Sequence, residues 1–139
     1  MQLAHALITA SATVAGLLGC IHMLYTFHGN KLHPRDPALR DAMMAVSPVL
    51  TRQTTVWRAT KGFNASHSLG VMLFAVIYIY LAGWHADFLQ ASPFLLALGL
   101  VTLLTYLALA RVYWFSIPFR GIALACGLYV AGLAVMVLP

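Results

Sequence analysis

The stretch Ala65–Trp84, ASHSLGVMLFAVIYIYLAGW, runs for twenty residues without a Lys, Arg, Asp or Glu. A helix of this length and composition can cross the hydrocarbon core of a bilayer, which is about 30 Å thick. After a short break comes Pro93–Phe115, PFLLALGLVTLLTYLALARVYWF, which is equally apolar apart from Arg111. The two runs therefore predict a pair of transmembrane helices.

Two further apolar runs flank this pair, at Leu3–Phe27 and Ile117–Leu138. All four should be helices, because the backbone groups of an open strand would be left unpaired in lipid. The breaks at Trp84–Asp87 and Ser116–Pro118 are short, so they predict antiparallel hairpins, and Ser92-Pro93 is typical of a helix start. We expect an all-α membrane protein in which residues 1–139 form a single four-transmembrane-helix bundle.

The composition agrees with a bilayer environment. Of the 139 residues, 62% are hydrophobic and 8% are charged, whereas a soluble domain carries roughly 25% charged residues. The net charge of +5 comes from cations next to the apolar runs. These cations favour anionic lipid headgroups as partners and argue against nucleic acid.

The distribution of cations predicts the orientation. Two of the eight, Arg111 and Arg120, flank the break between the last two spans, and the other six lie in the loop 29–64. Because positive residues gather on the cytoplasmic side, this loop should be cytoplasmic and both termini should lie on the non-cytoplasmic side. No Lys or Arg precedes the first run, which favours a retained helix over a cleaved signal peptide.

The long loop contains two helix-start signals, Asp36-Pro37 and Ser47-Pro48. Each precedes apolar residues at helical spacing, so we expect short amphipathic helices in the membrane interface. An ordinary solvated connector is the alternative.

Small residues recur every four positions in the first and last spans. Such stripes allow close helix approach in lipid, either within the bundle or against a partner protein. They are Ser11, Ala15 and Gly19 in the first span, and Ala123, Gly127 and Ala131 in the last.

The topology gathers polar side chains at the cytoplasmic end, where they could bind a lipid or another amphiphile. His22 is the most deeply placed, and ionisable groups inside a membrane are functional hypotheses by default. The candidate ligand-binding residues are Tyr25, Trp57, Arg58, Lys61, Asn64, Ser66, His67, Arg111 and Arg120.

His22 and His67 should lie on neighbouring helices, and two facing imidazoles could hold a b-type haem or a metal ion. Every Asp lies in a loop, so no carboxylate is at hand to orient an imidazole. The alternatives are that both histidines only hydrogen-bond within the bundle, through Tyr25, Asn64, Ser66 or backbone groups, or that they line a polar pocket for an amphiphile.

The segment Gly62-Phe63-Asn64-x-Ser66-His67 is the most distinctive part of the chain. Together with His22-x-x-Tyr25-Thr26-Phe27 and Trp57-Arg58-Ala59, it resembles a family of small bacterial four-helix membrane proteins that has no assigned activity. The resemblance covers about the first half of the chain. It implies a location in the bacterial inner membrane, draws attention to Asn64, Ser66 and His67, and supplies no catalytic role.

Nucleophilic triads, phosphate-binding glycine loops and paired carboxylates are absent from the sequence. We therefore expect a non-enzymatic protein that binds lipid or amphiphile at its cytoplasmic end, or that serves as an accessory subunit of a larger membrane complex. A membrane-protein partner or a homo-oligomer would fit the second role. The alternative is a small membrane oxidoreductase in which His22 and His67 hold haem or a metal.

Overall fold

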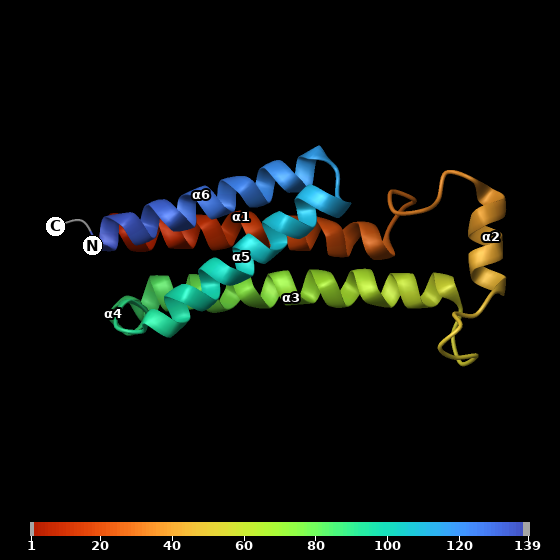
Figure 1. Cartoon of the computed structure of the whole chain (residues 1–139), viewed down its shortest axis with the longest axis horizontal. Helices are drawn as coiled ribbons and strands as arrows, with labels where there is room; N and C mark the ends of the chain where they lie inside the picture. Colours follow the sequence, from red (N-terminus) through yellow and green to blue (C-terminus); the bar gives the residue numbers. More distant parts are fainter. Residues whose placement is uncertain (1, 138–139) are drawn as a thin grey trace. The chain divides into compact units, whose positions relative to one another are not determined.

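The structure is a computed structural model that describes residues 2–137, and every regular element in that range is a helix (Figure 1). Four of these helices, α1, α3, α5 and α6, are long and apolar enough to cross a membrane. The prediction of an all-α protein with four transmembrane helices is therefore confirmed. The elements are α1 Gln2–Phe27, α2 Pro37–Ala45, α3 Val56–Trp84, α4 Ala86–Gln90, α5 Pro93–Tyr113 and α6 Ser116–Val137.

The described chain divides into two compact units. The bundle unit comprises residues 2–18 and 71–137, and the loop unit comprises residues 19–70. Helices α1 and α3 contribute to both units, so the expectation of a single domain stays a prediction.

In the bundle unit, α1 and α6 run antiparallel and side by side (Figure 1). The hydroxyl of Ser11 donates a buried hydrogen bond of 2.6 Å to the carbonyl oxygen of Ala125. On one side of this bond Gly121 lies against Leu18, and on the other Gly132 lies against Ile8. Lipid provides no hydrophobic drive for helices to associate, so α1 and α6 must be held together by van der Waals packing and hydrogen bonds. Small residues along the contact allow the two backbones to come close enough for both.

The two predicted small-residue stripes have different roles. In the first span, Ser11 and Ala15 are buried, so this stripe packs inside the protein. In the last span, Gly127 and Ala131 are exposed, and that stripe faces outward. The contacts of α6 with α1 come from a different set of small residues, namely Gly121, Ala125 and Gly132.

Two buried tyrosines join the remaining helices of the bundle unit. Tyr78 of α3 donates a hydrogen bond of 2.6 Å to the carbonyl oxygen of Leu95, and Tyr129 of α6 donates one of 3.1 Å to that of Leu96. Both acceptors lie in α5, where Gly99 leaves room for the two rings. The tyrosines are thus buried with their hydroxyl groups satisfied, as a lipid environment demands.

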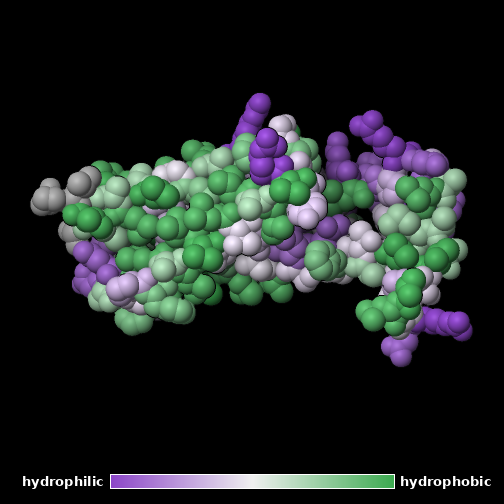
Figure 2. Space-filling view, viewed as in Figure 1, coloured by the Kyte–Doolittle hydropathy of each residue, from purple (hydrophilic) through white to green (hydrophobic). Residues whose placement is uncertain are grey.

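The outer surface of the bundle unit is apolar. Figure 2 shows mainly hydrophobic residues over the visible face of this unit. A soluble monomer rarely exposes large contiguous apolar patches, so this surface suits contact with lipid. Exposed large side chains include Leu3, Val76, Phe94, Val101, Val112 and Ile117.

In the loop unit, the end of α1 and the start of α2 follow from local chemistry. Gly29 has a φ of 77° and ends α1, since glycine adopts this left-handed conformation without a Cβ penalty. Asp36 caps α2 by accepting a hydrogen bond of 2.9 Å from the backbone N–H of Ala38, and Pro37 is the first helical residue. The first of the two predicted short helices is therefore present, and its location in the membrane interface stays a prediction.

The second predicted short helix is wrong. Residues 46–55 form a loop, closed by a hydrogen bond of 2.9 Å from the N–H of Val56 to the carbonyl oxygen of Val46. Helix α3 begins at Val56 rather than at the predicted Ala65. The connection before α3 therefore ends at Thr55, and not at Asn64 as the predicted loop 29–64 did.

The earlier start of α3 has a simple cause. Thr55 caps the helix, because its hydroxyl oxygen accepts a hydrogen bond of 3.3 Å from the N–H of Arg58. Hydropathy falls over Arg58, Lys61 and Asn64, and the predicted boundary followed that fall. A fall in hydropathy marks where a span leaves the hydrocarbon core, however, and the helix itself can continue beyond that point.

Candidate functional site

His22 of α1 and His67 of α3 lie in ring contact within the loop unit. Their ring centroids are 5.5 Å apart, and the ring planes are inclined at 80°. Near the end of α1, Lys61 of α3 places its ammonium group 5.4 Å from the centroid of the Phe27 ring. The two contacts show that α1 and α3 run antiparallel in this unit. They also bring together the two histidines that the sequence analysis placed on neighbouring helices.

The Nε2 atom of His22 is buried and has no hydrogen-bond partner. Two polar neighbours in sequence satisfy backbone groups instead: Thr26 donates to the carbonyl oxygen of His22, and Ser66 donates to that of Phe63. The alternative in which hydrogen bonds within the bundle satisfy the histidines therefore fails for this nitrogen. A buried polar group without a partner costs about 1–3 kcal/mol.

The spacing of the two ring centroids can be compared with the spacings that haem and a single metal ion require. With metal–nitrogen bonds of about 2.0–2.1 Å, imidazoles on opposite sides of an ion have ring centroids roughly 6.4 Å apart, and in tetrahedral coordination roughly 5.2 Å apart. The observed 5.5 Å is closer to the tetrahedral value. A haem iron needs its two axial ligands on opposite faces, so the pair suits a single ion better than haem.

A complete protein ligand set for a metal is not seen. Within residues 2–137 no group of three or more His, Cys, Asp and Glu side chains could hold an ion. Asn64 is half-buried and lies three residues before His67, hence on the same side of α3. Its carboxamide oxygen is a candidate additional ligand, beside two imidazoles that suit zinc, copper, iron or nickel.

Most of the other predicted site residues are exposed. Tyr25, Arg58 and Ser66 are exposed. Trp57 is half-buried, and its ring centroid lies 4.9 Å from that of His33. In the bundle unit, Arg111 and Arg120 are exposed.

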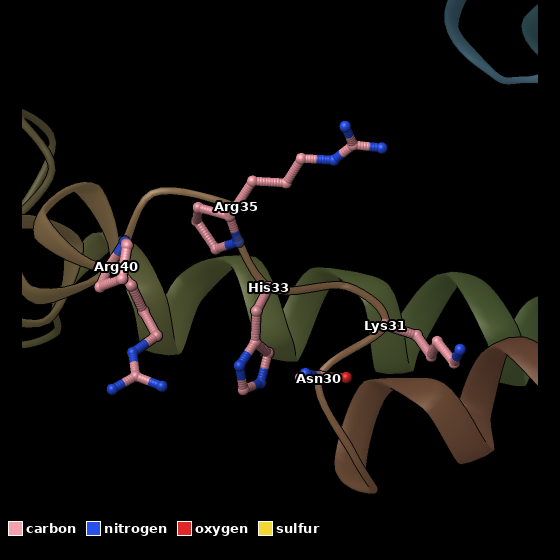
Figure 3. A pocket seen from close by; sticks show the side chains of 7 residues that line it. Asn30, Lys31, His33, Arg35 and Arg40 are labelled. Atoms are coloured by element: carbon pink, nitrogen blue, oxygen red, sulfur yellow. The ribbon is translucent and has the colours of Figure 1, made fainter.

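A basic hollow in the loop unit was missed by the sequence analysis. It has a volume of about 580 Å³. Figure 3 shows the side chains of Arg40 and His33 extending to one side of the loop and that of Arg35 to the opposite side. The loop cations were visible in the sequence, but their arrangement around a hollow depends on how residues 30–40 fold. The lining residues are Asn30, Lys31, His33, Pro34, Arg35, Pro37 and Arg40.

The charges of the loop unit favour an anion. The unit contains six Lys and Arg residues and two Asp residues, which gives a net charge of +4. The only ion pair given by the described residues joins Arg40 to Asp41 at 3.7 Å, with both side chains largely exposed, and such a pair contributes little. The Nε atom of Arg40 is buried and has no hydrogen-bond partner.

The loop 46–55 presents an apolar tip. A turn closed by the N–H of Thr51 and the carbonyl oxygen of Pro48 projects Val49 and Leu50, with relative exposures of 109% and 93%. Arg52 follows and is also exposed. Exposed apolar surface of this kind marks sites of contact with a membrane or with another protein.

Comparison of the chain with protein-family models, curated proteins and solved structures gave no match. The resemblance based on Gly62-Phe63-Asn64-x-Ser66-His67 therefore stays a prediction.

Proposed function

We propose that this chain is a non-enzymatic integral membrane protein that binds anionic lipid headgroups through its loop unit. The observation that carries the proposal is the net charge of +4 in the loop unit. Lys31, Arg35 and Arg40 line one hollow, and Arg35 and Arg40 extend to opposite sides of the loop (Figure 3), so the cations can contact more than one headgroup. Each Lys or Arg near a membrane surface contributes about 1 kcal/mol of attraction to anionic lipid. A phosphate oxygen would also give the buried Nε–H of Arg40 the partner it lacks.

The apolar tip supports the same function. Val49 and Leu50 can enter the boundary between headgroups and acyl chains while Arg52 stays at the level of the phosphates. Apolar insertion and electrostatic attraction act together in such interfacial segments. The tip would hold the hollow close to the lipid headgroups.

We place the loop unit on the cytoplasmic side of a bacterial inner membrane, with both termini on the opposite side. The cation distribution supports this orientation, because Lys and Arg gather in cytoplasmic loops. The bacterial location rests on the family resemblance.

A lipid titration in detergent tests the proposal. In a micelle no charged surface attracts lipid, so a headgroup binds only at a site on the protein. Native mass spectrometry with added phosphatidylglycerol would count bound lipids, with phosphatidylcholine as the zwitterionic comparison. We expect selective binding of phosphatidylglycerol to the wild-type chain.

The test variant is Lys31→Gln/Arg35→Gln/Arg40→Gln. The variant loses three cations that can donate charge-assisted hydrogen bonds to a phosphate, and phosphatidylglycerol binding should weaken at least tenfold, which corresponds to about 1.4 kcal/mol. The matched control, Arg58→Gln/Arg111→Gln/Arg120→Gln, removes the same charge at exposed positions outside the hollow and should weaken binding much less. Equal weakening in both variants would show that net charge alone attracts the lipid, and the site would have to be abandoned.

The accessory-subunit role is a second candidate. It is supported by the outward-facing positions Gly127 and Ala131 on α6, since exposed small residues permit close approach of a helix from another protein. Absence of selective lipid binding, together with a stoichiometric protein that copurifies with the chain and is lost in Gly127→Leu, would favour this role.

A further inference from the structure

We propose that His22 and His67 bind one divalent transition metal ion of the zinc class between α1 and α3. This site is separate from the basic hollow and does not depend on headgroup binding. Metal binding between α1 and α3 is independent of both lipid binding and the accessory-subunit role.

The first argument is geometric. The ring centroids lie 5.5 Å apart, close to the roughly 5.2 Å expected for two imidazoles on a tetrahedral ion. Both ligands project from helices rather than from loops, and sites on regular elements are held more precisely. The contact of Lys61 with Phe27 keeps α1 beside α3 nearby.

The second argument is the buried Nε2 atom of His22, which lacks a hydrogen-bond partner. A neutral imidazole nitrogen is among the commonest metal ligands in proteins. Coordination of a metal ion would give this atom the partner it lacks. The hydroxyl groups of Thr26 and Ser66 are already engaged with backbone carbonyl oxygens.

Two imidazoles fill half of a tetrahedral coordination sphere. Asn64, on the same side of α3 as His67, could supply a carboxamide oxygen, and water or a small anion would complete the set. With no carboxylate or thiolate in the ligand set, the protein leaves the charge of the ion uncompensated. We therefore expect the affinity to be lower than that of a structural zinc site with four protein ligands.

The experiment uses the full chain, without a polyhistidine tag, purified in mild detergent and stripped of metal with a chelator. Zn²⁺ is added, free metal is removed, and bound zinc is measured by inductively coupled plasma mass spectrometry. We expect one ion per wild-type chain. His22→Gln and His67→Gln should each reduce the affinity at least tenfold, whereas His28→Gln and His85→Gln should retain wild-type binding.

Co²⁺ provides a second readout on the wild-type chain, which covers the case in which a histidine variant fails to fold. Its ligand-field spectrum and X-ray absorption should show four-coordinate geometry with imidazole nitrogen ligands. Sulfur ligation would instead assign the ion to Cys20 or Cys126 and overturn the proposal. So would a folded wild-type chain that takes up no Zn²⁺, or equal loss of zinc in His85→Gln and His67→Gln.

Discussion

Gly132→Ala should destabilise the bundle unit, because Gly132 of α6 packs directly against side-chain and backbone atoms of α1. A methyl group added there would lie 2.9 Å from Cγ1 of Ile8 and 3.1 Å from the carbonyl oxygen of Ala4. The isoleucine side chain can rotate, but the carbonyl belongs to the backbone of α1. The helices must therefore move apart to admit the methyl group.

Gly127→Ala is a matched control on the same helix. Nothing lies within 4 Å of a methyl group added at Gly127, and the position is exposed. Both substitutions gain the same helix propensity, at most about 1 kcal/mol. Overpacking of a well-packed contact costs about 1–3 kcal/mol. The free energy of unfolding of Gly132→Ala should therefore be lower than that of Gly127→Ala by about 1–3 kcal/mol.

The assay is equilibrium unfolding in mixed micelles, with the denaturing detergent SDS as the variable and helix content followed by circular dichroism. The wild-type chain and both variants are measured under identical lipid and detergent conditions. Equal unfolding free energies for the two variants, or a more stable Gly132→Ala, would refute the close approach of α1 and α6 at this position.

Two further predictions concern other contacts. Ser11→Ala removes the hydrogen bond to Ala125 and should lower the unfolding free energy by about 0.6 kcal/mol, the average for such bonds between membrane helices. The same mixed-micelle assay measures this change, with Thr13→Val as the exposed control. Equal unfolding free energies for the two variants would contradict a contribution from the bond. Leu50→Trp should place an indole at the membrane interface, so that brominated lipid quenches its extra fluorescence; fluorescence quenched only by a water-soluble quencher would show that the loop tip does not enter the membrane.

The four spans could be predicted because length and hydropathy alone decide whether a helix can cross a bilayer. Ser92-Pro93 and Asp36-Pro37 were readable as helix starts, since capping depends on residues within one turn. The start of α3 was missed because Thr55 gives a capping signal without Pro, while the fall in hydropathy over Arg58 and Lys61 pointed to a later boundary.

The contact between His22 and His67 could be foreseen from topology, which places both residues at the same end of antiparallel spans. The basic hollow could not, because its shape depends on the fold of an irregular loop around Pro34 and Pro37. The exposure of Gly127 and Ala131 could not be predicted from the sequence either. The spacing of small residues identifies a stripe on one side of a helix, but it does not tell whether that side is buried or exposed.

Helix α3 has 29 residues and is therefore about 43 Å long, whereas the hydrocarbon core is about 30 Å thick. The part of α3 that belongs to the loop unit runs from residue 56 to residue 70, and residue number along it is a scale of position along the helix axis. His67 lies nine residues beyond Arg58, which is about 14 Å along that axis. A metal ion bound at His67 and the charge of Arg58 would therefore lie at different levels of the helix, so the two positive charges would not be concentrated at one level.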